Sequence, residues 1–264
     1  MSSCASLTLH PDGVKMPMFG LGTYHATAPR DVHAMLDAAL CKGYRLIDTA
    51  AVYGNEADIG KSLQELLPKY GLKRNDLFLV SKIASNDLGA CATANSIRRS
   101  VDLLNPKTDR DEQGLVRAIG VSNFEIHHLE QLKASAPSVW PPAVNQFEIH
   151  PHMTRKDLVK YCTDNGIALM AYSSLGRMEP DLIDEPLLNA TAKIHSTTVA
   201  NVLLTWAYQQ GYIVIPKSVQ PQRINDNWDG VITKRMQLTN EEIDAISALN
   251  RGKPYTLCTP WLVA

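Results

Sequence analysis

The chain has 264 residues, and its 26 Lys and Arg against 27 Asp and Glu give a formal net charge of -1. Such a chain lacks the positive field that non-specific nucleic-acid binding requires, and it has no apolar run near the roughly 20 residues that span a bilayer. A hydrophobic content of 45% excludes an intrinsically disordered chain. The five cysteines form no CxxC pair, which argues against a disulfide scaffold or a zinc site. We therefore expect a soluble cytoplasmic protein without a metal and without a nucleic-acid or membrane partner.

Residues 6–16 are predicted to form a β-hairpin, because Pro11-Asp12-Gly13 is a turn sequence. Short apolar runs then predict buried strands at residues 19–24, 44–49, 77–82, 116–121, 143–148, 167–172 and 212–216. Helical patterns follow at residues 32–41, 56–67, 93–104, 126–134, 155–164, 198–210, 221–231 and 241–249. This alternation indicates a parallel sheet covered by helices, in a single domain of residues 1–264.

Two arrangements of this sheet are possible. One is an open, doubly wound sheet, and the other is a closed (β/α)8 barrel. No GxGxxG fingerprint follows a strand, because Gly20-Leu21-Gly22-Thr23 lacks the third glycine. Polar side chains recur where strands end, which is where a barrel gathers its active site. They are Asp48, Lys82, Ser122, Asn123, Gln146, Tyr172 and Lys217. These features favour an α/β fold of the (β/α)8 TIM-barrel type.

The count of strand–helix units is one short of eight. Residues 105–113 include Pro106 and several charged side chains, so this segment cannot be a buried parallel strand. We therefore expect that one βα unit is missing between Leu104 and Gly114, either as a true deletion or as omitted residues. The loss of a strand breaks the relation of strand number, shear and tilt in a barrel, which predicts low stability.

The sharpest chemical constellation is that of Asp48, Tyr53 and Lys82. Asp48 and Lys82 end successive strands and Tyr53 follows the first of them, so a barrel brings all three to its catalytic mouth. A neighbouring ammonium favours the tyrosinate, which makes Tyr53 a candidate general acid for a carbonyl that becomes an alcohol. The structural alternative makes Asp48 a helix N-cap, Lys82 one side of a surface ion pair and Tyr53 a packing residue.

Several motifs together resemble the aldo-keto reductase family. They are Gly20-Leu21-Gly22-Thr23-Tyr24, Asp48-Thr49-Ala50-Ala51-Val52-Tyr53-Gly54-Asn55-Glu56, Ser81-Lys82, Gly114 to Phe124 with its Gly120-Val121-Ser122-Asn123, Asn145-Gln146, Ala171-Tyr172-Ser173 and Ile215-Pro216-Lys217-Ser218. They follow the family's order over almost the whole chain. The resemblance implies a (β/α)8 barrel, NADPH as cofactor and reversible hydride transfer to an aldehyde or ketone, with Asp48, Tyr53 and Lys82 as catalytic residues.

The resemblance also implies a set of cofactor-binding residues. Ser122, Asn123 and Gln146 would hydrogen-bond the nicotinamide carboxamide, and the ring of Tyr172 would stack on the nicotinamide. The rest of the set is Gly22, Thr23, Ser173 and Leu175, the last two near the pyrophosphate, with Lys217, Ser218 and Arg223 at a 2′-phosphate and Asn227 at the adenine. Tyr24 and Val52 would line the substrate pocket, and residues 254–262 are candidates to fold over the mouth.

One departure from the family is specific. The family's fourth catalytic residue, a histidine in a His-Trp-Pro motif, has no counterpart in this sequence, and the missing unit is where it would lie. His150 and His152 follow a strand and are weighed as substitutes; the alternative makes them exposed loop histidines. Loss of such a positioned group typically costs about 10²–10⁴ in rate.

Two functions therefore remain open. The first is an NADPH-dependent carbonyl reductase, a monomer acting on a small-molecule carbonyl, in which Tyr53 is the acid assisted by Lys82 and Asp48. The second is a catalytically impaired NADPH-binding or interaction protein, a deletion or splice form that lacks the histidine.

Overall fold

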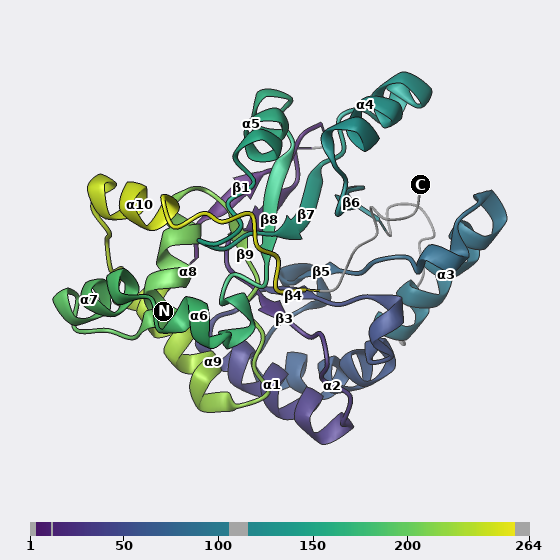
Figure 1. The fold of residues 1–264 in the computed structure, drawn as a ribbon. Coiled ribbons are helices and arrows are strands. Elements are labelled where there is room, and N and C mark those ends of the chain that lie inside the picture. Colours follow the sequence, from purple (N-terminus) through teal and green to yellow (C-terminus); the bar gives the residue numbers. More distant parts are fainter. Residues whose placement is uncertain (1–3, 12, 106–115, 257–264) are drawn as a thin grey trace. The chain divides into compact units, whose positions relative to one another are not determined.

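The computed structural model describes residues 4–11, 13–105 and 116–256 (Figure 1). Its contacts divide the chain into two units. The first contains Met1–Cys4, Phe19–Val116 and Lys217–Trp228, and the second contains Ala5–Met18, Arg117–Pro216 and Asp229–Ala264. Each unit has its own parallel sheet, and each is described below by itself.

The sheet of the first unit has three parallel strands in the order β3 (Leu21–Gly22), β4 (Leu46–Asp48) and β5 (Phe78–Val80). The register sets Gly22 beside Asp48 and Asp48 beside Val80. Gly22 also forms a parallel bridge with Lys217. The carboxyl ends of the three strands and the segment that starts at Lys217 therefore meet at one edge of the sheet.

Four helices accompany this sheet: α1 (Pro29–Lys42), α2 (Glu56–Lys69), α3 (Ala90–Leu104) and α9 (Pro221–Trp228). Helix α1 contacts both α2 and α9, and Figure 1 shows α1 and α2 side by side. Phe19, Tyr44 and Trp228 form a buried aromatic cluster with ring centroids 4.7–6.2 Å apart. The Tyr44 hydroxyl donates to the carbonyl oxygen of Ile224 at 3.0 Å, so the cluster that joins α9 to the unit carries no unpaired phenol.

Helix α3 is attached to α2 by a very close backbone approach. A Cβ atom on Gly60 would lie 1.9 Å from the carbonyl oxygen of Leu103, so only glycine allows this contact. Nearby, the buried carboxylate of Glu56 accepts hydrogen bonds from Ser81 at 2.6 Å and from Ser100 at 3.1 Å. Glu56 thus links the start of α2 to the segment after β5 and to α3.

The second unit begins with an antiparallel hairpin of β1 (Ser6–Thr8) and β2 (Lys15–Pro17). Its parallel sheet has the order β6 (Val121–Ser122), β7 (Val144–Glu148), β8 (Ala168–Tyr172) and β9 (Ile213–Val214). The register pairs Ser122 with Gln146 and Glu148 with Tyr172. Polar side chains at the carboxyl ends of β6, β7 and β8 are therefore neighbours.

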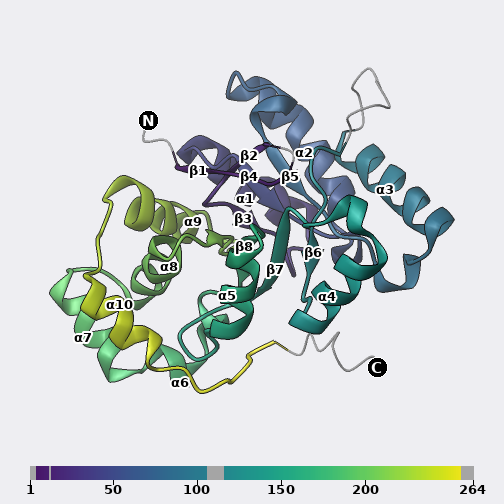
Figure 2. The same ribbon diagram turned by 90° about the horizontal axis from the view of Figure 1, so that it is seen from above.

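The helices of the second unit are α4 (Ile126–Ser135), α5 (Lys156–Asp164), α6 (Pro180–Ile183), α7 (Pro186–Ile194), α8 (Val199–Gln209) and α10 (Asn240–Ser247). Helix α8 is apolar on nearly every face and is buried along residues 201–207, because it contacts both β9 and α7. Figure 2 shows α7 and α8 within the same group of helices. In the described part of the chain, no helix has the length and apolar character needed to cross a membrane.

The predicted alternation of strands and helices is confirmed, as is the N-terminal hairpin, of which Asp12 lies outside the described residues. The predicted strand at residues 116–121 is wrong in its bounds, because the strand that forms spans Val121–Ser122. Helices α6 and α7 were not expected; each starts at a proline, which is well suited to the first helical position. The missing βα unit was predicted at a segment of which residues 106–115 lie outside the described residues.

Replacement of Gly60 by Ala tests the contact between α2 and α3. Helix propensity alone predicts that Ala stabilises a helix interior by about 1 kcal/mol. The approach of the Leu103 carbonyl predicts the opposite sign, and we expect the free energy of unfolding in urea to fall by about 1–3 kcal/mol. Lys61→Ala, at the exposed neighbouring position, is the matched control and should change it little. A stabilised Gly60→Ala variant would contradict the close approach.

Candidate active site

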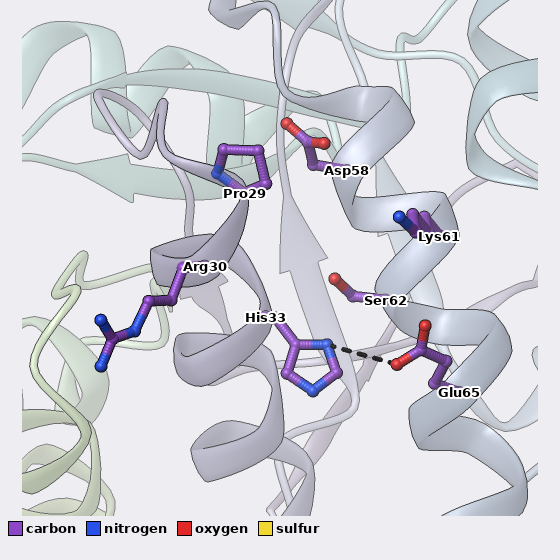
Figure 3. Close-up of a pocket in the computed structure, with 7 residues that line it drawn as sticks. All are labelled: Pro29, Arg30, His33, Asp58, Lys61, Ser62 and Glu65. Carbon is purple, nitrogen blue, oxygen red and sulfur yellow. Dashed lines mark ion pairs between the residues drawn. The ribbon is translucent and has the colours of Figure 1, made fainter.

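A surface pocket of about 230 Å³ lies between α1 and α2 (Figure 3). Its walls mix cations with carboxylates, and the ion pair drawn in it joins His33 Nδ1 to Glu65 Oε2 at 4.0 Å. None of the residues that the sequence marks as functional lines it. The candidate site is therefore sought at the carboxyl ends of the parallel strands.

Asp48, Lys82 and Tyr53 lie together at the edge of the first unit's sheet. The Lys82 Nζ atom is 2.7 and 2.8 Å from the two carboxylate oxygens of Asp48 and 3.4 Å from the Tyr53 hydroxyl. It also donates to the Thr49 carbonyl at 2.9 Å and lies 5.1 Å from the centroid of the Tyr53 ring. The Lys82 ammonium thus stands between a carboxylate and a phenol, with its donors directed to both.

The structural alternative for these residues does not agree with the geometry. The side chains of Lys82 and Asp48 are 19% and 4% exposed, so their ion pair is not a surface pair. Asp48 caps no helix, since Ala50 precedes the 3₁₀ turn Ala51–Tyr53 and Asn55 precedes α2. A desolvated carboxylate needs a paired cation, and Lys82 supplies it.

The loop that presents Tyr53 is fixed by a buried carboxamide that sequence reasoning did not single out. Asn55 donates to the carbonyl oxygens of Thr23 and Ala26, both at 3.0 Å, and accepts from the Thr49 hydroxyl at 2.7 Å. The Thr23 hydroxyl in turn donates to the Asp48 carbonyl at 3.0 Å. Asn55 lies within a motif quoted for the family, but only the fold shows that its partners lie around 30 residues earlier.

The two residues predicted to line a substrate pocket lie beside Tyr53. The rings of Tyr24 and Tyr53 have centroids 4.9 Å apart, and Val52 directly precedes Tyr53. Tyr24 is 44% exposed and Val52 is 68% exposed. An aromatic ring that packs on Tyr53 and an aliphatic side chain next to it in the chain therefore both present surface that solvent reaches.

The second unit brings together four of the predicted cofactor-binding residues. The Ser122 hydroxyl and the Asn123 N–H donate to the Gln146 carbonyl at 3.1 and 2.8 Å. The Tyr172 hydroxyl donates to the Asn123 side-chain oxygen at 2.9 Å. These hydroxyl and amide groups include both donors and acceptors, which is the set that a carboxamide can pair with.

The loop after β8 holds two more predicted residues, Ser173 and Leu175. Ser173 has φ 52° and Gly176 has φ 54°, so the chain turns sharply there. The Gly176 N–H donates to the Ser173 carbonyl at 2.7 Å. The loop is compact and follows directly on the strand that carries Tyr172.

The residues predicted to bind the 2′-phosphate and the adenine all belong to the first unit. Lys217 lies beside Gly22, and Ser218 accepts a hydrogen bond from the Gln220 N–H at 3.0 Å just before α9 begins. Arg223 is exposed in the first turn of α9, whereas Asn227 is buried. Two cations near a helix N-terminus are a suitable donor set for a phosphate.

The view of His150 and His152 as exposed loop histidines is wrong, because both rings are fully buried. His150 Nε2 lies 3.0 Å from a Glu148 carboxylate oxygen, and His152 Nε2 lies 2.9 Å from Glu185. Both partners lie within the second unit, and each pairs with the Nε2 atom of its histidine. The described residues contain no cluster of three or more His, Cys, Asp or Glu side chains that could hold a metal ion.

Comparison with known proteins gives one consistent result. The model of the Aldo/keto reductase family matches residues 18–112 and 108–178. Glyoxal reductase of Bacillus subtilis is 37% identical over 94% of this chain and 94% of its own length, and aldose reductase B of Dictyostelium discoideum is 33% identical over 96% and 94%.

Solved structures agree with the sequence comparison. An aldo-keto reductase of Bombyx mori, crystallised in complex with NADP, has a TM-score of 0.88 relative to this chain. The two are 28% identical, over 100% of this chain and 98% of that one. An aldo-keto reductase from a Medee basin deep-sea metagenome library has a TM-score of 0.84 at 32% identity over 94% and 96%. The predicted (β/α)8-barrel fold class is thus confirmed. The chain belongs to the aldo/keto reductase family of oxidoreductases.

Proposed function

We propose that this oxidoreductase reduces an aldehyde or ketone to the alcohol with NADPH, and that Tyr53, Lys82 and Asp48 carry out the proton transfer. The observation that supports this proposal most directly is the Lys82 ammonium, which lies 2.7 Å from the Asp48 carboxylate and 3.4 Å from the Tyr53 hydroxyl. The overall reaction consumes the carbonyl, NADPH and one proton, and it forms the alcohol and NADP⁺.

The proposed roles follow from charge. NADPH, when bound, supplies the hydride that adds to the carbonyl carbon. Tyr53 donates its hydroxyl proton to the carbonyl oxygen, on which negative charge develops. The Lys82 ammonium stabilises the phenolate that remains on Tyr53, and Asp48 holds Lys82 in place through both carboxylate oxygens. Tyr24 and Val52 provide apolar surface against which the carbonyl compound is held.

The second unit supplies the groups proposed for the nicotinamide. Ser122, Asn123 and Gln146 hydrogen-bond its carboxamide, and the ring of Tyr172 stacks on it. The hydrogen bond from Tyr172 to Asn123 at 2.9 Å supports this assignment, because it fixes the phenol ring relative to the amide. Ser173 and Leu175 contact the pyrophosphate in this proposal.

The first unit supplies the groups proposed for the adenosine end of the cofactor. Lys217, Ser218 and Arg223 bind the 2′-phosphate, which gives a preference for NADPH over NADH. Asn227 contacts the adenine. Gly22 and Thr23, at the end of β3, complete the set. The bridge between Gly22 and Lys217 supports this assignment, because it places the end of β3 beside the proposed phosphate-binding segment.

A catalytically impaired NADPH-binding protein is the second candidate. The sequence has no His-Trp-Pro motif, so a second hydrogen-bond donor to the carbonyl oxygen is not identified. Turnover with a panel of small aldehydes, ketones and dicarbonyls separates the two candidates, because the impaired form binds NADPH without oxidising it. In either case we propose a monomer in the cytoplasm, in keeping with the exposed free thiols of Cys41 and Cys91.

Tyr53→Phe is expected to lower kcat for NADPH-dependent aldehyde reduction by about 10²–10⁴-fold, because the ring is kept and the proton donor is lost. The Kd for NADPH should change little. Tyr70→Phe is the matched control, since it also removes a phenol hydroxyl, in this case one that donates to the Asp37 carboxylate at 2.7 Å. Wild-type turnover that survives in Tyr53→Phe would exclude Tyr53 as the acid.

Arg223→Ser is expected to raise the Kd for NADPH by about tenfold or more, because it removes a charged donor to phosphate. The Kd for NADH, which has no 2′-phosphate, should stay within a factor of about two. Fluorescence titration with both nucleotides measures the two constants. Gln222→Ser, at the preceding exposed position of α9, is the control. Equal losses for NADPH and NADH would contradict a role at the 2′-phosphate.

Lys217 provides a pH-dependent test. Desolvation lowers the pKa of its ammonium from the ordinary 10.5, and the Asp31 carboxylate opposes this shift. A lowered pKa increases the neutral fraction at a given pH, so acylation of Lys217 should reach half its limiting rate below pH 10.5. Peptide mass spectrometry after competitive labelling measures this midpoint.

NADP⁺ should slow the labelling of Lys217 and leave that of Lys61, which is exposed as Lys217 is, unchanged. The Lys217→Arg variant lacks the amine that is acylated, so the labelled peptide that disappears in this variant is the one that contains Lys217. A midpoint at or above pH 10.5 would contradict the desolvation of Lys217, and unchanged labelling with saturating NADP⁺ would contradict its place at the phosphate.

A further inference from the structure

The last described residues of the chain, 250–256, lie across the carboxyl end of β7 as an extended strap. The N–H groups of Arg251 and Lys253 donate to the His152 carbonyl at 3.2 and 3.0 Å. The side chain of Asn250 accepts from the Thr154 N–H at 3.0 Å. Backbone hydrogen bonds thus fix the strap at its start.

The far end of the strap is fastened by a buried carboxylate. Glu148, the last residue of β7, is 1% exposed. One of its oxygens accepts from the Tyr255 N–H at 2.7 Å, and the other accepts from the N–H and the hydroxyl of Thr256. Burial alone would raise the pKa of Glu148, but the hydrogen bonds from His150, Thr256 and the Tyr255 N–H outweigh it and lower that pKa. Glu148 is therefore ionised when it holds the strap.

Tyr255 is held by its ring and its hydroxyl as well. Its hydroxyl lies 2.6 Å from His152 Nδ1, and its ring centroid lies 4.8 Å from that of His150. Burial lowers the pKa of His152, and its Nε2 atom lies 2.9 Å from Glu185. Burial raises the pKa of the Tyr255 phenol, and the Asp181 carboxylate, with which its hydroxyl also interacts, helps to raise it. His150 and His152 are both fully buried, whereas Tyr255 is half-buried.

The ring of Tyr255 also meets the loop after β8. A Cβ atom on Gly176 would lie 3.2 Å from two carbons of the Tyr255 ring, so ring and loop backbone are in contact. This loop contains three non-glycine residues with left-handed backbone, Ser173, Arg177 and Met178, with φ between 52° and 61°. Such conformations persist only where surrounding groups hold them. Tyr255 meets the loop at Gly176, between Ser173 and Arg177, and its own N–H is held by Glu148 at the end of β7.

We propose that Tyr255 is a positioning residue: fastened by Glu148 and His152, it holds the loop of residues 173–179 in its strained conformation and so slows release of the cofactor from that loop. The effect on the cofactor rests on the proposed function, in which Ser173 and Leu175 contact the pyrophosphate. The effect on the loop does not, because the contact between Tyr255 and Gly176 involves protein alone.

The test that is independent of cofactor is limited proteolysis. Arg177 is exposed within the loop, and trypsin cleaves after it only when the backbone opens locally. Tyr255→Ala should raise the rate of cleavage after Arg177 by about tenfold or more. Tyr255→Phe keeps the ring on Gly176 and the N–H on Glu148, and should stay within about threefold of wild type. Tyr161→Ala, a tyrosine of α5 bonded to Glu130, is the matched control and should match wild type.

The second test is the rate of NADPH release, measured by stopped-flow fluorescence with an excess of NADP⁺ as the displacing ligand. Tyr255→Ala should release NADPH about tenfold faster or more, and Tyr255→Phe should restore slow release. Circular dichroism confirms that each variant is folded. A structural role alone would change stability without the rescue by Phe or the selective cleavage after Arg177.

The outcomes separate the two proposals. Faster cleavage after Arg177 in Tyr255→Ala, rescued by Phe, supports the positioning role whether or not NADPH binds. If the wild-type chain binds no NADPH, the proposed function fails and so does the effect on release. If it binds NADPH and a folded Tyr255→Ala matches wild type in both cleavage and release, the positioning role is overturned and the proposed function stands.

Discussion

The desolvated carboxylate of Asp48 is the constraint on which the first unit's site depends. Only 4% of this side chain is exposed, and a buried charge without a partner is strongly unfavourable. Lys82 supplies the opposite charge, and removal of one partner from such a pair costs about 3–5 kcal/mol. The same ammonium lies 3.4 Å from the Tyr53 hydroxyl, so the group that neutralises Asp48 also sets the charge around the phenol.

A related logic applies to the second unit. Glu148 is also a buried carboxylate at the end of a parallel strand, but its partners are N–H and O–H donors and a histidine rather than a lysine. Asp48 therefore orients a cation, whereas Glu148 orients a piece of backbone. In both cases the register of the sheet sets the position of the carboxylate. The groups around it donate hydrogen bonds to both of its oxygens.

The order of the elements and several residues of the candidate site could be predicted from sequence, because they depend on local patterns. Apolar runs and turn residues gave the order of the elements, and the ends of the strands indicated Asp48, Lys82, Gln146 and Tyr172. The burial of His150 and His152 was not predictable, because Tyr255 and Glu185 are distant in sequence. The hydrogen bonds by which Asn55 fixes the loop of Tyr53 could not be predicted for the same reason. The start of α1 at Pro29 was also missed, since its N-cap is Ala28, which carries no capping side chain.

The contact between Gly60 and Leu103 has a consequence for how this chain tolerates changes of length. Helix α3 is seated on α2 by its own backbone, by Ser100 on Glu56, and by Arg74, whose Nε donates to the Asn105 side chain at 2.6 Å. All of these attachments precede residue 106. These contacts of α3 therefore do not depend on the length of the chain beyond Asn105, so an insertion or deletion after that residue leaves them in place.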